Sequence, residues 1–171
     1  MSNEIVEDKS GTGHLMHATS IFLDGLGILI GGPSGIGKSA LALDLLNDAH
    51  GFDNVLLNSG GSLLVADDQT HIGRDERGES VKLVARCPKN IEGMLEVRGL
   101  GIIKVPHKSP APIDLYVEIV DDLPERMPEV EDQYRYILEV KLAYIQIHKD
   151  DGLAKARVRA ALYAHTRGKL L

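Results

Sequence analysis

The sequence predicts a single α/β domain, because strand-like and helix-like segments are mixed along a chain of 171 residues. That length suits one domain and is hardly enough for two. A glycine-rich stretch follows the most continuous apolar run, and a segment with helix-forming composition comes directly after it. A buried strand, a tight loop and a helix in that order are typical of α/β domains.

The first part of the chain divides into a leader and a hairpin. Residues 1–13 are charged and lack periodicity, so we expect a flexible leader, with one catalytic domain over 14–171. Residues 14–23 have strand composition, and 26–30 form an apolar run that suits a strand buried on both faces. The Asp24-Gly25 pair between them is a strong hairpin-turn signal.

The remaining elements follow from composition and spacing. Residues 38–48 predict a helix, and 153–167 predict an amphipathic closing helix with Lys and Arg between its apolar residues. Further strands are expected at 62–66, 81–85, 101–105, 113–120 and within 136–147. Loops are expected at 51–61, which is rich in Asn and Gly, and at 121–132, which is acidic and contains Pro.

Composition excludes several classes of protein. The 19 Lys and Arg against 25 Asp and Glu give a net charge of −6, which argues against a nucleic-acid-binding protein. One cysteine, Cys87, cannot form an internal disulfide. No apolar stretch approaches the ~20 residues that span a bilayer, so no membrane association is expected. We therefore expect a cytoplasmic protein.

The most specific motif is a phosphate-binding loop. It matches the pattern G-x-x-x-x-G-K-[ST] without a mismatch and consists of Gly32, Pro33, Ser34, Gly35, Ile36, Gly37, Lys38 and Ser39. The glycines allow backbone N–H groups to wrap phosphate oxygens, and the following helix adds its positive end. Lys38 supplies a cation for the β- and γ-phosphates, and Ser39 a hydroxyl for Mg²⁺. The loop therefore predicts a nucleoside triphosphate with Mg²⁺ as ligands.

A pair of carboxylates follows the strand predicted at 62–66. Asp67 and Asp68 are adjacent, so their side chains point in different directions and can have different roles. One can approach the metal or hold a partner, while the other receives a proton from an attacking hydroxyl. The alternative is an Asp pair that only caps a turn.

Three ordered strings, GPSGIGKSALAL, LLVADD and MLEVRGLGIIKV, resemble the catalytic domain of bacterial HPr kinase/phosphorylase. His17-Ala18-Thr19 stands where that family keeps an active histidine. The chain is similar to the short alphaproteobacterial form, which lacks the N-terminal domain of longer members. The resemblance implies a fold like the nucleotide-binding core of phosphoenolpyruvate carboxykinase. It also implies an ATP- and Mg²⁺-dependent protein-serine kinase that acts on an HPr-like phosphocarrier and forms homo-oligomers, usually hexamers.

The resemblance also implies roles for single residues. Asp68 corresponds to the base that takes the serine proton, and Asp67 supports His17 or the metal site. Glu96 matches the second Mg²⁺ ligand beside Ser39. His17 corresponds to a residue that orients the nucleophile. Arg126 resembles an arginine that reaches the phosphates, across a subunit boundary in the family.

The chain departs from the family pattern near its end. Residues 147–152 read IHKDDG where the family carries a Pro-Gly-Arg-Asn-like stretch linked with dephosphorylation. This departure argues against phosphorolysis more than against the kinase reaction. Two alternatives stay open: a small-molecule P-loop kinase, for which the arginine-rich lid is missing, and a nucleotide-binding regulator without transfer activity.

Overall fold

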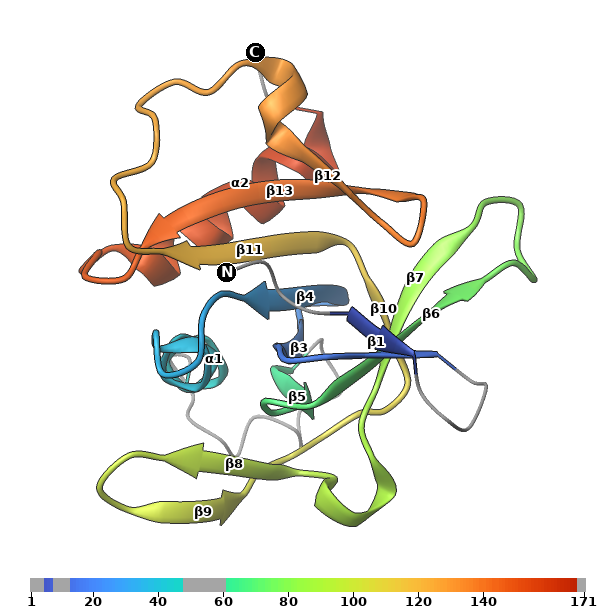
Figure 1. The fold of residues 1–171 in the computed structure, drawn as a ribbon, viewed down its shortest axis with the longest axis vertical. Coiled ribbons are helices and arrows are strands. Elements are labelled where there is room, and N and C mark those ends of the chain that lie inside the picture. The colour runs from blue at the N-terminus through green and yellow to red at the C-terminus, as the bar shows by residue number, and fades with distance from the viewer. Residues whose placement is uncertain (1–4, 8–12, 48–60, 169–171) are drawn as a thin grey trace.

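The computed structural model describes residues 5–7, 13–47 and 61–168, and these form a mixed α/β fold (Figure 1). Within these ranges there are two larger sheets, a separate two-stranded hairpin and two α-helices. The predicted α/β class is therefore confirmed. No helix in the described ranges is both long enough and apolar enough to cross a bilayer.

The larger sheet is mixed and has the strand order β12-β13-β11-β4-β3-β5. Its strands are β3 (Thr19–Leu23), β4 (Leu26–Gly31), β5 (Leu63–Ala66), β11 (Leu115–Val120), β12 (Tyr134–Ile137) and β13 (Val140–His148). β11 pairs in parallel with both β4 and β13, whereas β3 pairs antiparallel with β4 and with β5. As predicted from its apolar run, β4 lies in the interior of this sheet and is almost entirely buried.

The second sheet is antiparallel and has the order β1-β2-β6-β7-β10. Its strands are β1 (Ile5–Glu7), β2 (His14–Met16), β6 (Thr70–Asp75), β7 (Lys82–Arg86) and β10 (Ala111–Ile113). β1 lies inside residues 1–13, which were expected to be a leader without regular structure; residues 1–4 and 8–12 lie outside the described residues.

The remaining elements are a hairpin, two α-helices and two short 3-10 turns. They are α1 (Lys38–Leu46), α2 (Ala154–Arg167), β8 (Met94–Val97), β9 (Gly101–Lys104), η2 (Lys89–Ile91) and η3 (Val130–Gln133). Both predicted helices are confirmed. The predicted loop at 51–61 lies outside the described residues except for its last position.

Besides β1, three strands were not predicted from the sequence, each for a physical reason. β6 carries one large aliphatic residue, Ile72, among polar neighbours, so it shows little periodicity. β8 and β10 are short, at four and three residues. Their pairing partners, rather than their own composition, hold them in extended form.

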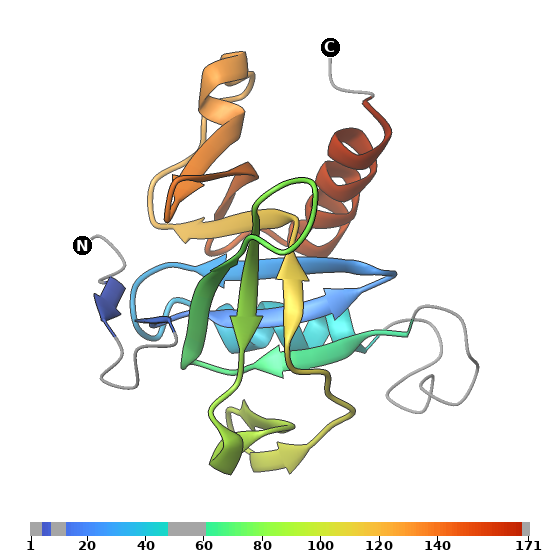
Figure 2. The same cartoon turned by 90° about the vertical axis from the view of Figure 1, so that its right-hand side faces the viewer.

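Two cores lie on the two faces of the larger sheet. On one face, side chains of α1 and α2 such as Leu45 and Val158 pack against Ile28 and Val117. On the other face, Leu29 and Tyr116 belong to a core shared with the second sheet. The order of layers is thus helices, larger sheet and second sheet; Figure 2 shows β6, β7 and β10 in front of the larger sheet, with α1 behind it.

The β3–β4 hairpin turns at the predicted Asp24-Gly25 pair. Both residues have positive φ, 51° and 89°, which matches the backbone twist that two-residue hairpin loops prefer. Because β4 returns toward the centre of the sheet at this turn, the hairpin sets the direction in which the phosphate-binding loop leaves the sheet.

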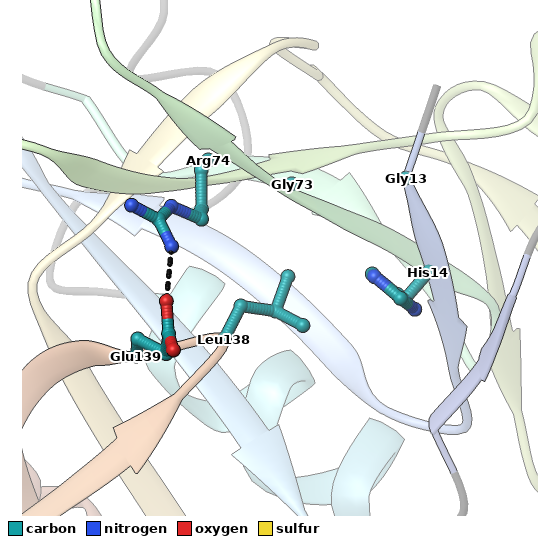
Figure 3. Close-up of a pocket in the computed structure, with 6 residues that line it drawn as sticks. All are labelled: Gly13, His14, Gly73, Arg74, Leu138 and Glu139. Carbon is teal, nitrogen blue, oxygen red and sulfur yellow. Dashed lines mark hydrogen bonds and ion pairs between the residues drawn. The ribbon is translucent and has the colours of Figure 1, made fainter. Parts of the chain in front are cut away.

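Around their shared core, the two sheets approach closely at one place and leave a cavity at another. At one, Gly27 of β4 lies against the backbone of Pro112, where an added Cβ would be 1.6 Å from the carbonyl oxygen. At the other, a cavity of about 420 Å³ lies between β2, β6 and the β12–β13 turn (Figure 3). Arg74 and Glu139 form an ion pair beside it, at 2.6 Å. None of the predicted site residues lines this cavity.

We predict that Gly27→Ala destabilises the fold by about 3 kcal/mol or more, because the methyl group would force two backbones apart. Thermal or urea unfolding measures this loss. Gly78→Ala is the matched control, since the nearest atom to its Cβ is 3.8 Å away and its backbone needs no positive φ. Equal stability of the two variants would contradict the proposed contact between the sheets.

Candidate active site

Carboxyl ends of several strands gather at one edge of the larger sheet. β4 and β11 run in parallel, and β5 has the same direction because β5 and β4 are both antiparallel to β3. The loop 32–37 leaves this edge after β4 and leads into α1, as Figure 1 shows. Asp67 and Asp68 leave it after β5. The topology therefore brings the two sequence motifs to the same place.

The phosphate-binding loop has the tight path that its glycines predict. Gly32, Gly35 and Gly37 have φ values of 137°, 76° and 115°, which side-chain-bearing residues rarely adopt. A Cβ at Gly32 would lie 2.6 Å from the carbonyl oxygen of Ile119 on β11. At Gly37 no side chain caps α1, and its first turn holds no acidic residue, so this end of the helix favours anions.

Lys38 is held inside the loop that precedes it. Its side chain is 4% exposed, and its Nζ donates hydrogen bonds to the carbonyl oxygens of Gly32 and Pro33 at 3.2 and 3.0 Å. Burial lowers the pKa of Lys38, while the nearby charges of Asp68 and Asp67 act in the opposite direction. The site thus contains a partly desolvated cation beside two carboxylates.

Asp67 connects three segments of the chain. Its Oδ1 accepts hydrogen bonds from the hydroxyls of Thr19 and Ser39, at 2.9 and 2.7 Å. Its Oδ2 accepts a hydrogen bond from the backbone N–H of Glu96, at 3.0 Å. The carboxylate therefore joins β3, the start of α1 and the β8–β9 hairpin. Of the two supporting roles expected for Asp67, its contacts favour the Ser39 side over His17.

Asp68 turns away from Asp67 and toward His17. Its φ of 61° lies in the left-handed region, which Asp tolerates better than most residues. Oδ1 of Asp68 lies 3.2 Å from Nε2 of His17, an ion pair whenever the imidazole is protonated. This His17 nitrogen is shielded from solvent and has no hydrogen bond of good geometry. The Asp68 side chain itself is about half exposed, so it can meet a second molecule.

The donor set fits a magnesium ion bound together with phosphates. Ser39 offers a hydroxyl, Asp67 a carboxylate beside it, and Glu96 an exposed carboxylate on the adjoining hairpin. The described residues hold no cluster of three or more His, Cys, Asp or Glu side chains suited to bind a metal alone. Mg²⁺ in nucleotide sites needs only one or two carboxylates, since phosphates and waters complete its shell.

Arg126, a predicted site residue, and Cys87, the single cysteine of the chain, both stand apart from this group. Arg126 is exposed on the segment after β11, which begins at the active edge, but it makes no hydrogen bond or ion pair with the described site residues. Cys87 is buried, and burial, followed by the charges of Glu92 and Asp67, raises the pKa of its thiol to about 11. A thiol with so high a pKa is a poor nucleophile.

Thr19 is a site residue that sequence reasoning missed. Besides donating to Asp67, its hydroxyl lies 3.4 Å from the backbone nitrogen of Asp68 and accepts that hydrogen bond. In the sequence it has the ordinary appearance of a β-branched strand residue. Only its position two residues after His17 offers a signal, because adjacent motif residues often share one site.

Known proteins with related sequences and structures point to one family. The family model described as HPr serine kinase C-terminal domain matches residues 9–167. An HPr kinase/phosphorylase from Chlorobium phaeobacteroides is 38% identical over 102 residues, which cover 60% of this chain and 27% of the relative. One from Malacoplasma penetrans is 32% identical over 157 residues, covering 85% and 46%. The chain thus spans about a quarter to a half of these relatives' lengths.

A solved structure agrees with the sequence relatives. The structure of the HPr(Ser) kinase/phosphatase from Coxiella burnetii superposes with a TM-score of 0.66 at 25% identity, covering 91% of this chain and 97% of that one. The family match extends over both cores and over every residue of the loop and the carboxylate pair. The chain belongs to the HPr serine kinase C-terminal domain family.

Proposed function

We propose that this chain is an ATP- and Mg²⁺-dependent protein-serine kinase that phosphorylates an HPr-like phosphocarrier of the sugar phosphotransferase system. One observation supports this function most directly: two adjacent carboxylates after β5 contact two different groups. Asp67 contacts Ser39 of the phosphate-binding loop, and Asp68 contacts His17. A kinase needs both functions side by side, one toward the nucleotide and one toward the acceptor hydroxyl.

The nucleotide side is built from the loop and α1. Backbone N–H groups of 32–37 and the start of α1 would hold the phosphates, with Lys38 as the cation at the β- and γ-positions. Ser39, Asp67 and Glu96 would hold Mg²⁺, which when bound neutralises charge on the β- and γ-phosphate oxygens. Placing this domain within the phosphoenolpyruvate carboxykinase type of nucleotide-binding fold is part of the proposal.

The acceptor side is built from Asp68 and His17. The serine oxygen attacks the γ-phosphorus, the bond from that phosphorus to the ADP oxygen breaks, and the serine proton passes to a carboxylate oxygen of Asp68. His17 lies 3.2 Å from that carboxylate and orients it. Lys38 stabilises the charge that develops on the transferred group. Atoms and charge balance with phosphoserine, ADP and a protonated Asp68 as products.

The carrier substrate is supported by the family alone. Relatives that share the matched region are named HPr kinase/phosphorylase, and the Coxiella structure is named HPr(Ser) kinase/phosphatase. We propose a homo-oligomer in which Arg126, exposed and unpaired within the described chain, reaches the phosphates of a neighbouring subunit. Because IHKDDG replaces the expected stretch at 147–152, we propose kinase activity without efficient phosphorolysis.

Co-incubation with an HPr-like phosphocarrier, ATP and Mg²⁺, followed by mass spectrometry, tests the function. The expected result is the gain of one phosphate on a serine of the carrier. ATP binding without transfer to a competent carrier would instead indicate a nucleotide-binding regulator. Transfer to a small metabolite rather than to the protein would indicate a small-molecule kinase.

Lys38→Ala is expected to lower the transfer rate at least ~100-fold, because it removes the buried cation beside the transferred phosphoryl group. The rate is measured with γ-labelled ATP and the carrier. Lys89→Ala is the control, since Lys89 is exposed in η2 and should leave transfer unchanged. Turnover of Lys38→Ala at the parent rate would remove this role of the loop.

Asp68→Asn is expected to lower the transfer rate by ~10²–10⁴ while ATP affinity stays near that of the parent, because the amide cannot accept the serine proton. Asn also tolerates the left-handed backbone at this position, so the fold is preserved. Asp122→Asn, an exposed carboxylate after β11, serves as the control. If Asp68→Asn transfers phosphate as fast as the parent, another group is the base.

A further inference from the structure

A second carboxylate site lies at the same edge of the larger sheet, outside the group described above. Glu118 on β11 accepts a hydrogen bond at Oε2 from the hydroxyl of Tyr144 on β13. Glu118 is half-buried, whereas Tyr144 is only 4% exposed. Burial and then the bond to Glu118 raise the pKa of Tyr144 to about 12, so the tyrosine remains a donor at physiological pH.

The tyrosine is itself fixed on both sides. Its ring lies 5.6 Å from the ring of Tyr116, and the guanidinium of Arg135 stacks over it at 3.9 Å. Arg135 also donates a hydrogen bond to the backbone carbonyl of Tyr134, at 3.0 Å. Glu118 is therefore held by a rigid donor, and its orientation is set before any second molecule arrives.

Register places Glu118 beside the active site. It pairs with Gly31 on β4, the residue immediately before the phosphate-binding loop. On the other side of β4, Thr19 pairs with Ile30, so His17 and Ala18 lie at the same end of the sheet. With neighbouring strands ~4.8 Å apart, the ends of β3 and β11 are separated by about 10 Å.

Glu118 also faces the layer away from α1. Side chains alternate along a strand, and Tyr116 on the same strand belongs to the core opposite the helices, as does Ala18. Gly31 between them has no side chain, so nothing from β4 rises between Glu118 and the His17–Ala18 corner. Glu118 and Asp68 therefore lie at the same edge of the sheet, on either side of β4 and β3, where Gly31 of β4 and Ala18, just before β3, are small and buried.

The carboxylate of Glu118 is partly exposed and has one side-chain partner among the described residues. Within the described residues its single side-chain hydrogen bond is the one from Tyr144, and it has no ion pair. The guanidinium of Arg135 contacts the Tyr144 ring and the Tyr134 carbonyl instead. A half-buried, oriented carboxylate with a free oxygen is suited to bind a cationic group.

We propose that Glu118 is a specificity-determining residue that binds a lysine or arginine side chain of the protein acceptor, close to the phosphorylated serine, and that Tyr144 is its positioning residue. This inference rests on the proposed kinase function and names a recognition contact for it. A charge contact on the acceptor side affects acceptor affinity and leaves nucleotide binding unchanged.

The central test compares Glu118→Gln with the parent chain. We expect the KM for the carrier to rise about tenfold, with kcat at saturating carrier and the KM for ATP within twofold of the parent. Carrier affinity in the parent should fall with salt, and this dependence should weaken in the variant. Glu79→Gln, an exposed carboxylate in the β6–β7 turn, is the matched control. Equal changes in both KM values, or none, would overturn the proposal.

Two further variants separate recognition from folding. Tyr144→Phe keeps the stacked ring and removes only the donor, so we expect a smaller rise in carrier KM, at unchanged melting temperature within about 5 °C. If Glu118→Gln fails to fold, this variant carries the test alone. On the carrier, Lys and Arg residues near the serine are replaced by Gln one at a time. We expect one of these carrier substitutions to be non-additive with Glu118→Gln in a double-mutant cycle of carrier affinity. If the effects of all of them add to that of Glu118→Gln, the proposed contact is contradicted.

Direct binding of the carrier, measured without ATP, keeps the two proposals distinguishable. If the parent chain transfers phosphate and Glu118→Gln binds the carrier as tightly as the parent, only the recognition contact is overturned. If carrier binding depends on Glu118 but the parent chain transfers no phosphate to the carrier, the kinase function is overturned and the contact is supported. Absence of both binding and transfer with a competent carrier overturns both.

Discussion

The candidate site depends on the hydrogen bonds that Asp67 accepts. Its two carboxylate oxygens hold the hydroxyls of Thr19 and Ser39 and the backbone N–H of Glu96. These groups come from β3, α1 and the β8–β9 hairpin, which are separated by up to 77 positions along the chain, since 96 − 19 = 77. A charged acceptor bonds each donor more strongly than a neutral one would, so one side chain fixes the mutual positions of three segments.

That arrangement leaves the neighbouring Asp68 free for a different partner. Asp67 and Asp68 both follow Ala66, the last residue of β5, and the left-handed backbone of Asp68 turns the chain at this point. As a result, one carboxylate belongs to the loop side and the other to the His17 side. Two negative charges so close together would repel each other if both faced the same ligand, and their separation avoids this cost.

The sheets beneath the site explain why the edge is rigid. Gly27 brings β4 into backbone contact with Pro112, and Gly32 lies against the carbonyl of Ile119. Both ends of β4 are therefore held by backbone atoms, which cannot move aside as a flexible side chain can. The Tyr144–Glu118 bond further fixes β11 to β13 at the same edge. Phosphate-binding loop, carboxylate pair and Glu118 thus share one stiff support.

The sequence alone determined the local structure: the phosphate-binding loop with its three left-handed glycines, the hairpin at Asp24-Gly25, the buried strand 26–30 and both helices. Each of these depends on neighbouring residues, through steric limits on φ or through periodicity. Tertiary structure alone decided that Asp67 turns toward Ser39 and Asp68 toward His17, that Thr19 joins them, and that β6 and β8 are strands. Strand order and register set those contacts, and both arise from pairing between distant segments that no local pattern encodes.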